Sequence, residues 1–156
     1  MCFPLVCDTA HAVKDLPPDI LELVETFEFL DDWTDKYRHL LDLAKALPPL
    51  EEEHKVDKNK VLGCMSQVWM VSDGVDAESR LTFRADSDAH IVRGLIAVLL
   101  KMYSGRSAKQ ILATDAIEVF AQLGLDEHLS VGRRNGLESM VKRIQSLAQA
   151  SVQSNA

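Results

Sequence analysis

Cysteine is scarce in this chain: three cysteines, Cys2, Cys7 and Cys64, stand among 156 residues. An odd and small number of cysteines excludes a framework of paired disulfides as the basis of the fold. Aromatic residues are also few, at 6% of the chain, yet apolar residues as a whole reach 47%. That apolar content and the length of the chain predict one domain with one hydrophobic core.

Positive charge is in deficit, because 17 lysines and arginines face 24 aspartates and glutamates, which leaves a net charge of −7. Such a surface argues against a nucleic-acid partner, whose phosphates require basic side chains. The longest apolar run, residues 95–100, is far shorter than the roughly 20 residues of a membrane span. The first residues have neither a basic start nor a sustained apolar segment, so no secretory signal is expected. We therefore expect a cytoplasmic protein that binds neither nucleic acid nor membrane.

Motifs for bound ligands are missing as well. No GxGxxG or Walker-type loop occurs, the five histidines show no HxxxH spacing, and the cysteines show no CxxC spacing. A stable iron–sulfur cluster normally takes several thiolates, whereas the expected domain supplies one, Cys64. The sequence therefore predicts no metal site.

Helical periodicity is present at both ends of the chain. Apolar residues recur at helical spacing after Pro17 and Pro18, and again from Trp33 until Pro48 ends the pattern. The almost wholly apolar segment after Ile91 predicts a central helix. Helices are expected over about 17–30, 33–47, 91–103 and 133–150, with two short helices opening at the capping pairs Ser107/Gln110 and Asp115/Glu118.

The middle of the chain has the period of a strand. Short strands are predicted over residues 60–63 and 66–72. The segment SDGVDAES (72–79) carries the hairpin signal Asp73-Gly74 in a loop longer than two residues, and RLTFRA (80–85) is the expected return strand. Helices before and after a cluster of strands predict an α+β fold, here with a small antiparallel sheet of about three strands.

The domain is expected to cover residues 17–150. Residues 1–16, which hold Cys2 and Cys7, are interpreted as an irregular leader without an assigned role. Residues 151–156 are interpreted as a frayed tail.

Cys64 lies in the segment VLGCMSQVWMV, between two predicted strands. A free cysteine is commonly a small, inert core residue. Gly63 beside it suits a tight turn that another molecule can approach, and the polar residues Ser66 and Gln67 indicate a loop. The chemistry of a thiol requires thiolate, and a free thiol with a pKa of about 8.5 is ionised only to a few per cent at neutral pH. Its local environment therefore decides whether Cys64 reacts.

Two other features bear on the site. His90, with Asp88 nearby in sequence, is the one histidine that could pair with Cys64 in a cysteine hydrolase, although no nucleophile motif surrounds Cys64. Gly132 and Gly136 flank a pair of arginines that begins at Arg133, which is typical of a solvated helix start. Two cations near a helix N-terminus oppose the macrodipole, and an anion or thiolate nearby would relieve this.

Three stretches together resemble the SufE/CsdE family of sulfur acceptors in iron–sulfur cluster biogenesis. They are GCMSQVW (63–69), DSDAHIVRGLIAVLLKMYSG (86–105) and RRNGLESMVKRI (133–144), and the helix at 31–50 is also similar. The likeness runs over residues 18–150, and the SQVW ending is nearer to SufE than to CsdE. It implies a SufE/IscU-like fold, which agrees with the α+β prediction made from periodicity.

The resemblance implies that Cys64 accepts sulfur as a persulfide from a cysteine desulfurase, SufS-like or CsdA-like, stimulates that enzyme and passes the sulfur to a SufB-type scaffold. The pyridoxal phosphate of this relay belongs to the desulfurase, so the protein is expected to have no cofactor of its own. The family match also implies that Asp88 influences the cysteine loop and the meeting with the desulfurase, and that Arg133 lies near the partner surface. From position alone, Asp88 would cap the helix near Ile91, and Arg133 would be an exposed charge at a helix start. Gly63, Ser66 and Gln67 are expected to support the loop or contact the partner.

Two alternatives stay open at this point. One is an adaptor or scaffold that holds a metal or cluster. The other is a cysteine hydrolase that uses His90.

Overall fold

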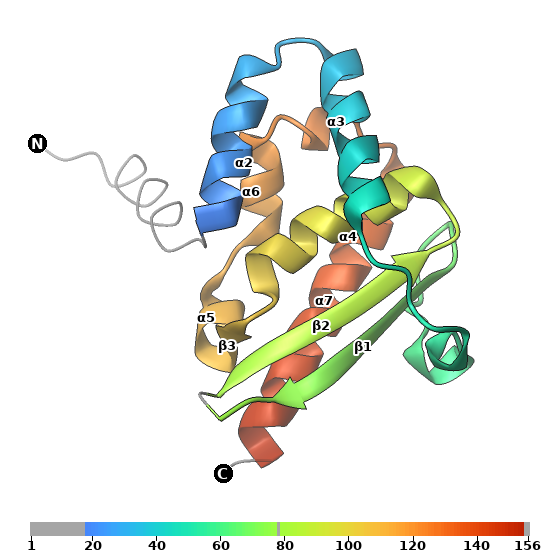
Figure 1. Cartoon of the computed structure of the whole chain (residues 1–156), viewed down its shortest axis with the longest axis vertical. Helices are drawn as coiled ribbons and strands as arrows, with labels where there is room; N and C mark the ends of the chain where they lie inside the picture. Colours follow the sequence, from blue (N-terminus) through green and yellow to red (C-terminus); the bar gives the residue numbers. More distant parts are fainter. Residues whose placement is uncertain (1–17, 78, 155–156) are drawn as a thin grey trace, which may run out of the picture.

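The computed structural model describes residues 18–77 and 79–154, and this part of the chain has six α-helices and one three-stranded sheet, which confirms the α+β prediction (Figure 1). The leader with Cys2 and Cys7 lies outside the described residues. The elements follow in the order α2 (Pro18–Phe29), α3 (Trp33–Ala46), η1 (Glu52–His54), η2 (Asp57–Asn59), β1 (Val68–Val75), β2 (Arg80–Ser87), α4 (His90–Tyr103), β3 (Arg106–Ser107), α5 (Ala108–Ala113), α6 (Ala116–Gln122), η3 (Asp126–His128) and α7 (Val131–Ser154).

Local capping sets the starts of several helices where the sequence predicts them. The side chain of Asp32 accepts a hydrogen bond from the backbone N–H of Thr34 and caps α3. Ser107 and Gln110 form the expected reciprocal capping box at the start of α5. The carboxylate of Asp115 accepts from the N–H of Glu118 at the start of α6.

The sheet is antiparallel, with the strand order β1-β2-β3. Val68 of β1 is paired with Ser87 of β2, and the side chains of Val68 and Met70 point into the core. The prediction of a strand over 60–63 is wrong, because only Lys60 makes an isolated bridge to β1. The third strand is instead β3, two residues that follow α4 and pair with the start of β2.

The first strand of the hairpin continues further along the chain than predicted. Asp73 and Gly74 belong to β1, where the register shifts between Ser72 and Val75. The chain then reverses after Asp76, whose carboxylate accepts a 2.9 Å hydrogen bond from the backbone N–H of Arg80. The bulge lengthens β1 past the Asp-Gly pair, which alone would predict a two-residue turn.

The central helix α4 packs against β2 and α3, and α7 runs along the hairpin (Figure 1). Gly94 permits the close contact with α3, because a Cβ there would lie 2.5 Å from the backbone oxygen of Leu40. The last helix is longer than predicted: α7 begins at Val131 and continues through Ser154, beyond the expected end at residue 150. The hydrophobic core surrounds α4, and all six α-helices and the sheet contribute buried side chains to it.

Candidate functional site

Cys64 lies on a short loop, residues 62–66, which we call the cysteine loop. Its first end is tied to β1, since the N–H of Val61 donates a 2.8 Å hydrogen bond to the carbonyl oxygen of Val68. Its second end is tied to the segment between β2 and α4. There the N–H of Gln67 donates to the carboxylate of Asp88 over 3.0 Å, and the N–H of Asp88 donates to the carbonyl oxygen of Gln67 over 3.3 Å.

Asp88 therefore acts on the loop and not on the helix that follows it. The N-cap of α4 is Ala89, and its side chain makes no capping bond. The prediction that Asp88 caps the helix near Ile91 is wrong in this respect. Its carboxylate faces Gln67, and this contact ties the end of the cysteine loop to the start of α4.

Three consecutive residues of the cysteine loop lie along three turns of α7. Gly63 contacts the side chain of Ser139, Cys64 lies against Gly136, and the side chain of Met65 covers Gly132. The loop reaches this position through Gly63, whose φ of +92° is in the left-handed region that favours glycine. The Sγ atom of Cys64 also donates a 3.6 Å hydrogen bond to the carbonyl oxygen of Gly136. Sequence reasoning assigned the two helical glycines to a solvated helix start, whereas they form the surface on which the loop rests.

A cavity of about 320 Å³ opens beside the thiol. The cysteine loop supplies Cys64, Met65 and Ser66 to it, and α4 and α7 supply the remaining walls together with Ser130. Arg133 lines the same cavity, so two residues far apart in sequence that were both predicted as site residues do meet. Apolar side chains form its floor: Val92, Leu95 and Met140.

The Cys64 thiol is half-buried, and this burial raises its pKa above the ordinary value of a thiol. A raised pKa keeps the resting group as a thiol rather than a thiolate at neutral pH. The resting position therefore shelters Cys64 and lowers its nucleophilicity.

Large apolar side chains gather at the surface around this site. Leu62 and Met65 of the cysteine loop are 80% and 81% exposed, and Val131 at the start of α7 is 74% exposed. Arg133 is exposed in the same turn of α7. Contiguous exposed apolar patches on proteins often serve as surfaces for a partner.

A buried hydrogen-bond network around Asp86 joins the end of β2 to α4, and sequence reasoning missed it. Asp86 is 1% exposed, and it accepts hydrogen bonds from the backbone N–H groups of Leu50 and Ser87 and from the guanidinium of Arg93. Burial alone would raise its pKa, but the two backbone donors and the charges of Arg93 and Lys55 together lower it below the ordinary value. In the sequence, the only hint was an aspartate and an arginine seven residues apart. Whether they form an ion pair depends on the direction in which α4 follows β2.

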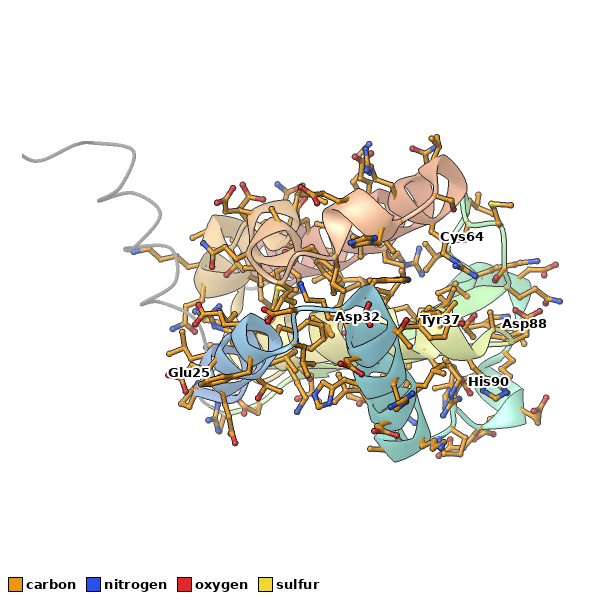
Figure 2. The ribbon with its side chains drawn as sticks, turned by 90° about the horizontal axis from the view of Figure 1, so that it is seen from above. Glu25, Asp32, Tyr37, Cys64, Asp88 and His90 are labelled. Carbon is orange, nitrogen blue, oxygen red and sulfur yellow. The ribbon has the colours of Figure 1, made fainter. Side chains whose placement is uncertain are left out.

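His90 stands apart from the thiol. Figure 2 shows Cys64 and His90 separated, with His90 at the exposed start of α4. Among the described residues that line the cavity beside Cys64, none is a histidine. The arrangement does not supply the base that a cysteine hydrolase requires.

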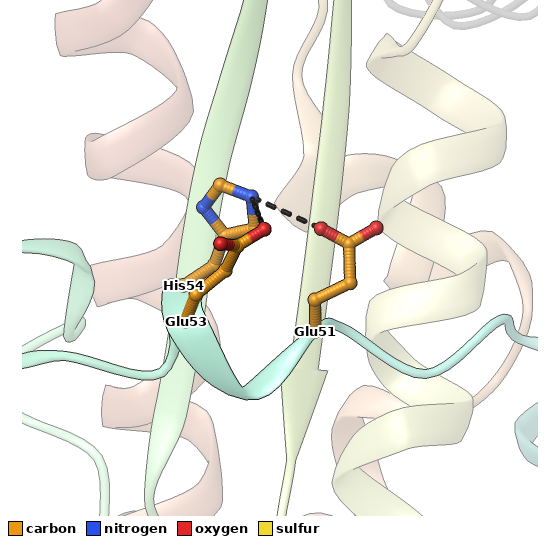
Figure 3. Close-up of side chains that lie close together, drawn as sticks. All are labelled: Glu51, Glu53 and His54. Atoms are coloured by element: carbon orange, nitrogen blue, oxygen red, sulfur yellow. Dashed lines mark ion pairs between the residues drawn. The ribbon is translucent and has the colours of Figure 1, made fainter.

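The described residues bring one group of three possible metal ligands together (Figure 3), and none of its members lines the cavity beside Cys64. The group consists of Glu51, Glu53 and His54 at η1, with Nε2 of His54 3.2 Å from a carboxylate oxygen of Glu51. Glu51 also lies 3.6 Å from the guanidinium of Arg84. Ion pairs within the group and with Arg84 account for this acidic cluster.

Comparisons with known proteins agree with this architecture. A family model described as "SufE: Fe-S metabolism associated domain" matches residues 21–148. The chain is 53% identical over 125 residues to an uncharacterized SufE-like protein of Rhizobium etli, covering 79% of this chain and 84% of the relative. It is 48% identical over 130 residues to an uncharacterized SufE-like protein of Rhizobium meliloti, covering 82% and 93%.

A solved structure shares the fold. The solution structure of a hypothetical protein from Thermus thermophilus superposes with a TM-score of 0.71 at 19% identity, covering 88% of this chain and 98% of that one. None of the helices in the described part of the chain has the length and apolarity to cross a membrane.

Proposed function

Because the chain belongs to the SufE family, we propose that it is a sulfur acceptor of iron–sulfur cluster assembly that takes persulfide sulfur from a cysteine desulfurase onto Cys64. The observation that carries the proposal is the setting of this thiol. Cys64 is the one cysteine among the described residues, and it lies on a glycine-containing loop at the mouth of a cavity. That setting suits a carrier, which needs one sheltered thiol and access for a donor.

The transfer needs one nucleophile and one electrophilic sulfur. The Cys64 thiolate attacks the outer sulfur of the desulfurase persulfide, a new sulfur–sulfur bond forms to Cys64, and the bond within the donor persulfide breaks. The electron pair of that bond leaves on the desulfurase cysteine, which becomes a thiolate again, so no external oxidant or reductant is consumed. Removal of the sulfur frees the desulfurase for another turnover, which explains why an acceptor would stimulate it.

The surroundings of Cys64 favour retention of the sulfur. A second thiol near a persulfide would attack it, form a disulfide and release the cargo as sulfide. No other cysteine is present among the described residues to do so. The cavity beside Cys64 has room for the additional sulfur atom, and its apolar floor excludes water from that side.

The partner is expected to dock on the exposed apolar side chains around the loop. Leu62, Met65 and Val131 surround Cys64 and offer a hydrophobic contact, and Arg133 adds a cation at the cavity. Because Cys64 is half-buried at rest, the cysteine loop moves outward when the donor binds. The raised pKa of the thiol then returns toward its ordinary value, so docking and activation occur together.

The carried sulfur then passes to a cluster scaffold of the SufB type, and we place this relay in the cytoplasm, whose reducing conditions keep Cys64 as a thiol. The same reaction occurs at the scaffold, with Cys64 now as the donor: a scaffold cysteine attacks the outer sulfur, and Cys64 leaves as a thiolate.

The test is a desulfurase assay with the wild-type chain and the Cys64→Ser variant. Wild type should accelerate the desulfurase, and its Cys64 peptide should gain one sulfur, about 32 Da, in the mass spectrum. Cys64→Ser keeps the docking face, so it should bind the desulfurase but neither gain mass nor stimulate. Full stimulation by Cys64→Ser would contradict the proposal. A count of iron and zinc after anaerobic reconstitution is the control, because stoichiometric metal on Cys64 would indicate a scaffold instead.

A further inference from the structure

The two glycines of α7 that face the cysteine loop occupy positions where a helix gains nothing from glycine. Gly132 and Gly136 lie four residues apart within α7, so they stand one turn above the other on one face. Glycine is the poorest helix former after proline, because it loses the most backbone freedom. Neither position has a left-handed φ that would require glycine. The reason for glycine therefore lies outside the helix.

Contacts with the cysteine loop supply that reason. A Cβ at position 136 would lie 3.3 Å from Sγ of Cys64 and 3.5 Å from both its Cα and its Cβ. A Cβ at position 132 would overlap the sulfur of Met65. The two contacts differ in kind: the tight one at 136 is with Sγ of Cys64 itself, while the loop backbone lies at ordinary contact distance, whereas the one at 132 involves the end of a flexible and exposed side chain.

We propose that Gly136, assisted by Gly132, is a positioning residue that holds Cys64 in its half-buried resting place. This inference rests on the proposed function, for which the resting place of the thiol matters. Only a helix face without side chains lets the loop lie so close that Sγ reaches the carbonyl oxygen of Gly136. A methyl group at 136 displaces Sγ of Cys64 by a few tenths of an ångström, which weakens its hydrogen bond to the carbonyl oxygen of Gly136 and leaves the thiol more exposed and more ionised.

The experiment measures how fast iodoacetamide alkylates Cys64 as a function of pH, with the Cys64 peptide followed by mass spectrometry in the full chain. Gly136→Ala should be alkylated about fivefold faster than wild type at pH 7, and the midpoint of its pH–rate profile should fall toward that of an ordinary thiol, about 8.5. Asn135→Ala is the matched control, since Asn135 is exposed in the same turn of α7. It should react like wild type.

A second pair of variants tests the same idea through the other contact. Gly132→Ala should raise the alkylation rate less than Gly136→Ala, because the side chain of Met65 can turn aside. The double variant Gly132→Ala/Met65→Ala removes the overlapping side chain and should return the rate to that of Met65→Ala alone. A merely structural role for the glycines would not produce this restoration.

The proposal is overturned if Gly136→Ala has the wild-type pH–rate profile. If Gly136→Ala does not fold, the alkylation rates of Gly132→Ala and its double variant decide instead. Equal alkylation rates for Gly132→Ala and wild type would then overturn the proposal. The desulfurase assay separates this result from the proposed function. If wild type gains sulfur but Gly136→Ala has an unchanged pH–rate profile, the proposed function stands and the positioning role is wrong. If the profile of Gly136→Ala shifts but wild type gains no sulfur, the proposed function alone is wrong.

Discussion

Asp86 and Cys64 are two polar groups held in opposite ways near the same end of the sheet. Asp86 is fully buried, with two backbone donors and two cations around its carboxylate. Cys64 is half-buried, and its thiol makes one long hydrogen bond to the carbonyl oxygen of Gly136. Arg93 extends the first arrangement, because it also donates to the carbonyl oxygens of Ala44 and Leu47 at the end of α3.

Asp86 thus belongs to a rigid buried network, whereas the contact of Cys64 with α7 can be broken more easily. A buried charge whose partners are all in place makes the surrounding elements rigid, and its loss leaves other charges unpaired. A loop held by a weak hydrogen bond and by van der Waals contact with glycine can leave its place at low cost. The network of Asp86 thus fixes the start of α4, whereas the cysteine loop is held at Cys64 by weaker contacts.

Deletion of the buried carboxylate should have the largest effect. Asp86→Ala leaves Arg93 buried without its counter-charge, so the free energy of unfolding should fall by about 3 kcal/mol. Urea denaturation followed by circular dichroism measures it. Asp73→Ala is the control, because Asp73 pairs with Arg84 at the surface over 2.8 Å and its loss should cost at most about 1 kcal/mol. Equal losses for the two variants would contradict the distinction drawn between framework and surface.

Acid should weaken the same network by a smaller amount. The pKa of Asp86 is lower in the folded chain than in the unfolded chain, so its contribution to stability is complete above the unfolded value of about 3.9 and is lost as the pH falls below that value toward the folded pKa. The melting temperature of wild type should therefore decline from about pH 4 downward. Asp86→Ala, which has no carboxylate at this position, should decline less over the same range. Parallel declines of the two proteins would show that Asp86 does not contribute this way.

Release of the loop end should have the smallest effect on stability and a clear effect on the thiol. Asp88→Ala removes the acceptor of the Gln67 N–H, a bond worth roughly 1 kcal/mol, so the cysteine loop should leave its place more often and Cys64 should be alkylated about fivefold faster. Asp42→Ala, an exposed aspartate on α3, is the control and should match wild type. An unchanged alkylation rate in Asp88→Ala would show that this bond does not hold the loop.

Much of the fold could be predicted because the signals are local. Helical periodicity and capping residues such as Asp32 and Ser107 act within a few residues, and the helices begin near the predicted positions. The third strand could not be predicted, because β3 consists of Arg106 and Ser107 and exists only through its pairing with β2. The turn signal at Asp73-Gly74 was misleading for the same reason, since the register with β2 outweighs a local preference.

The candidate site was predicted in its parts and not in its arrangement. Cys64 and Arg133 were both expected to matter, and the structure places them at one cavity. Asp88 was expected to influence the loop and does contact Gln67, but the helix cap assigned to it is absent from the described α4. Gly136 was assigned to a solvated helix start, because nothing in its neighbourhood along the chain shows that a loop 72 residues earlier would rest on it.

The amino-acid order by itself determined which segments become helices, where most of them begin, and that a single thiol follows a glycine ahead of the first long strand. These features depend on interactions between residues a few positions apart, which can be recognised from the local sequence pattern. Tertiary structure alone decided that Cys64 rests on a face of α7 without side chains, that its burial raises its pKa, and that Arg93 meets Asp86. Those properties depend on distances between elements far apart in the chain, and packing sets these distances only when the whole core has formed.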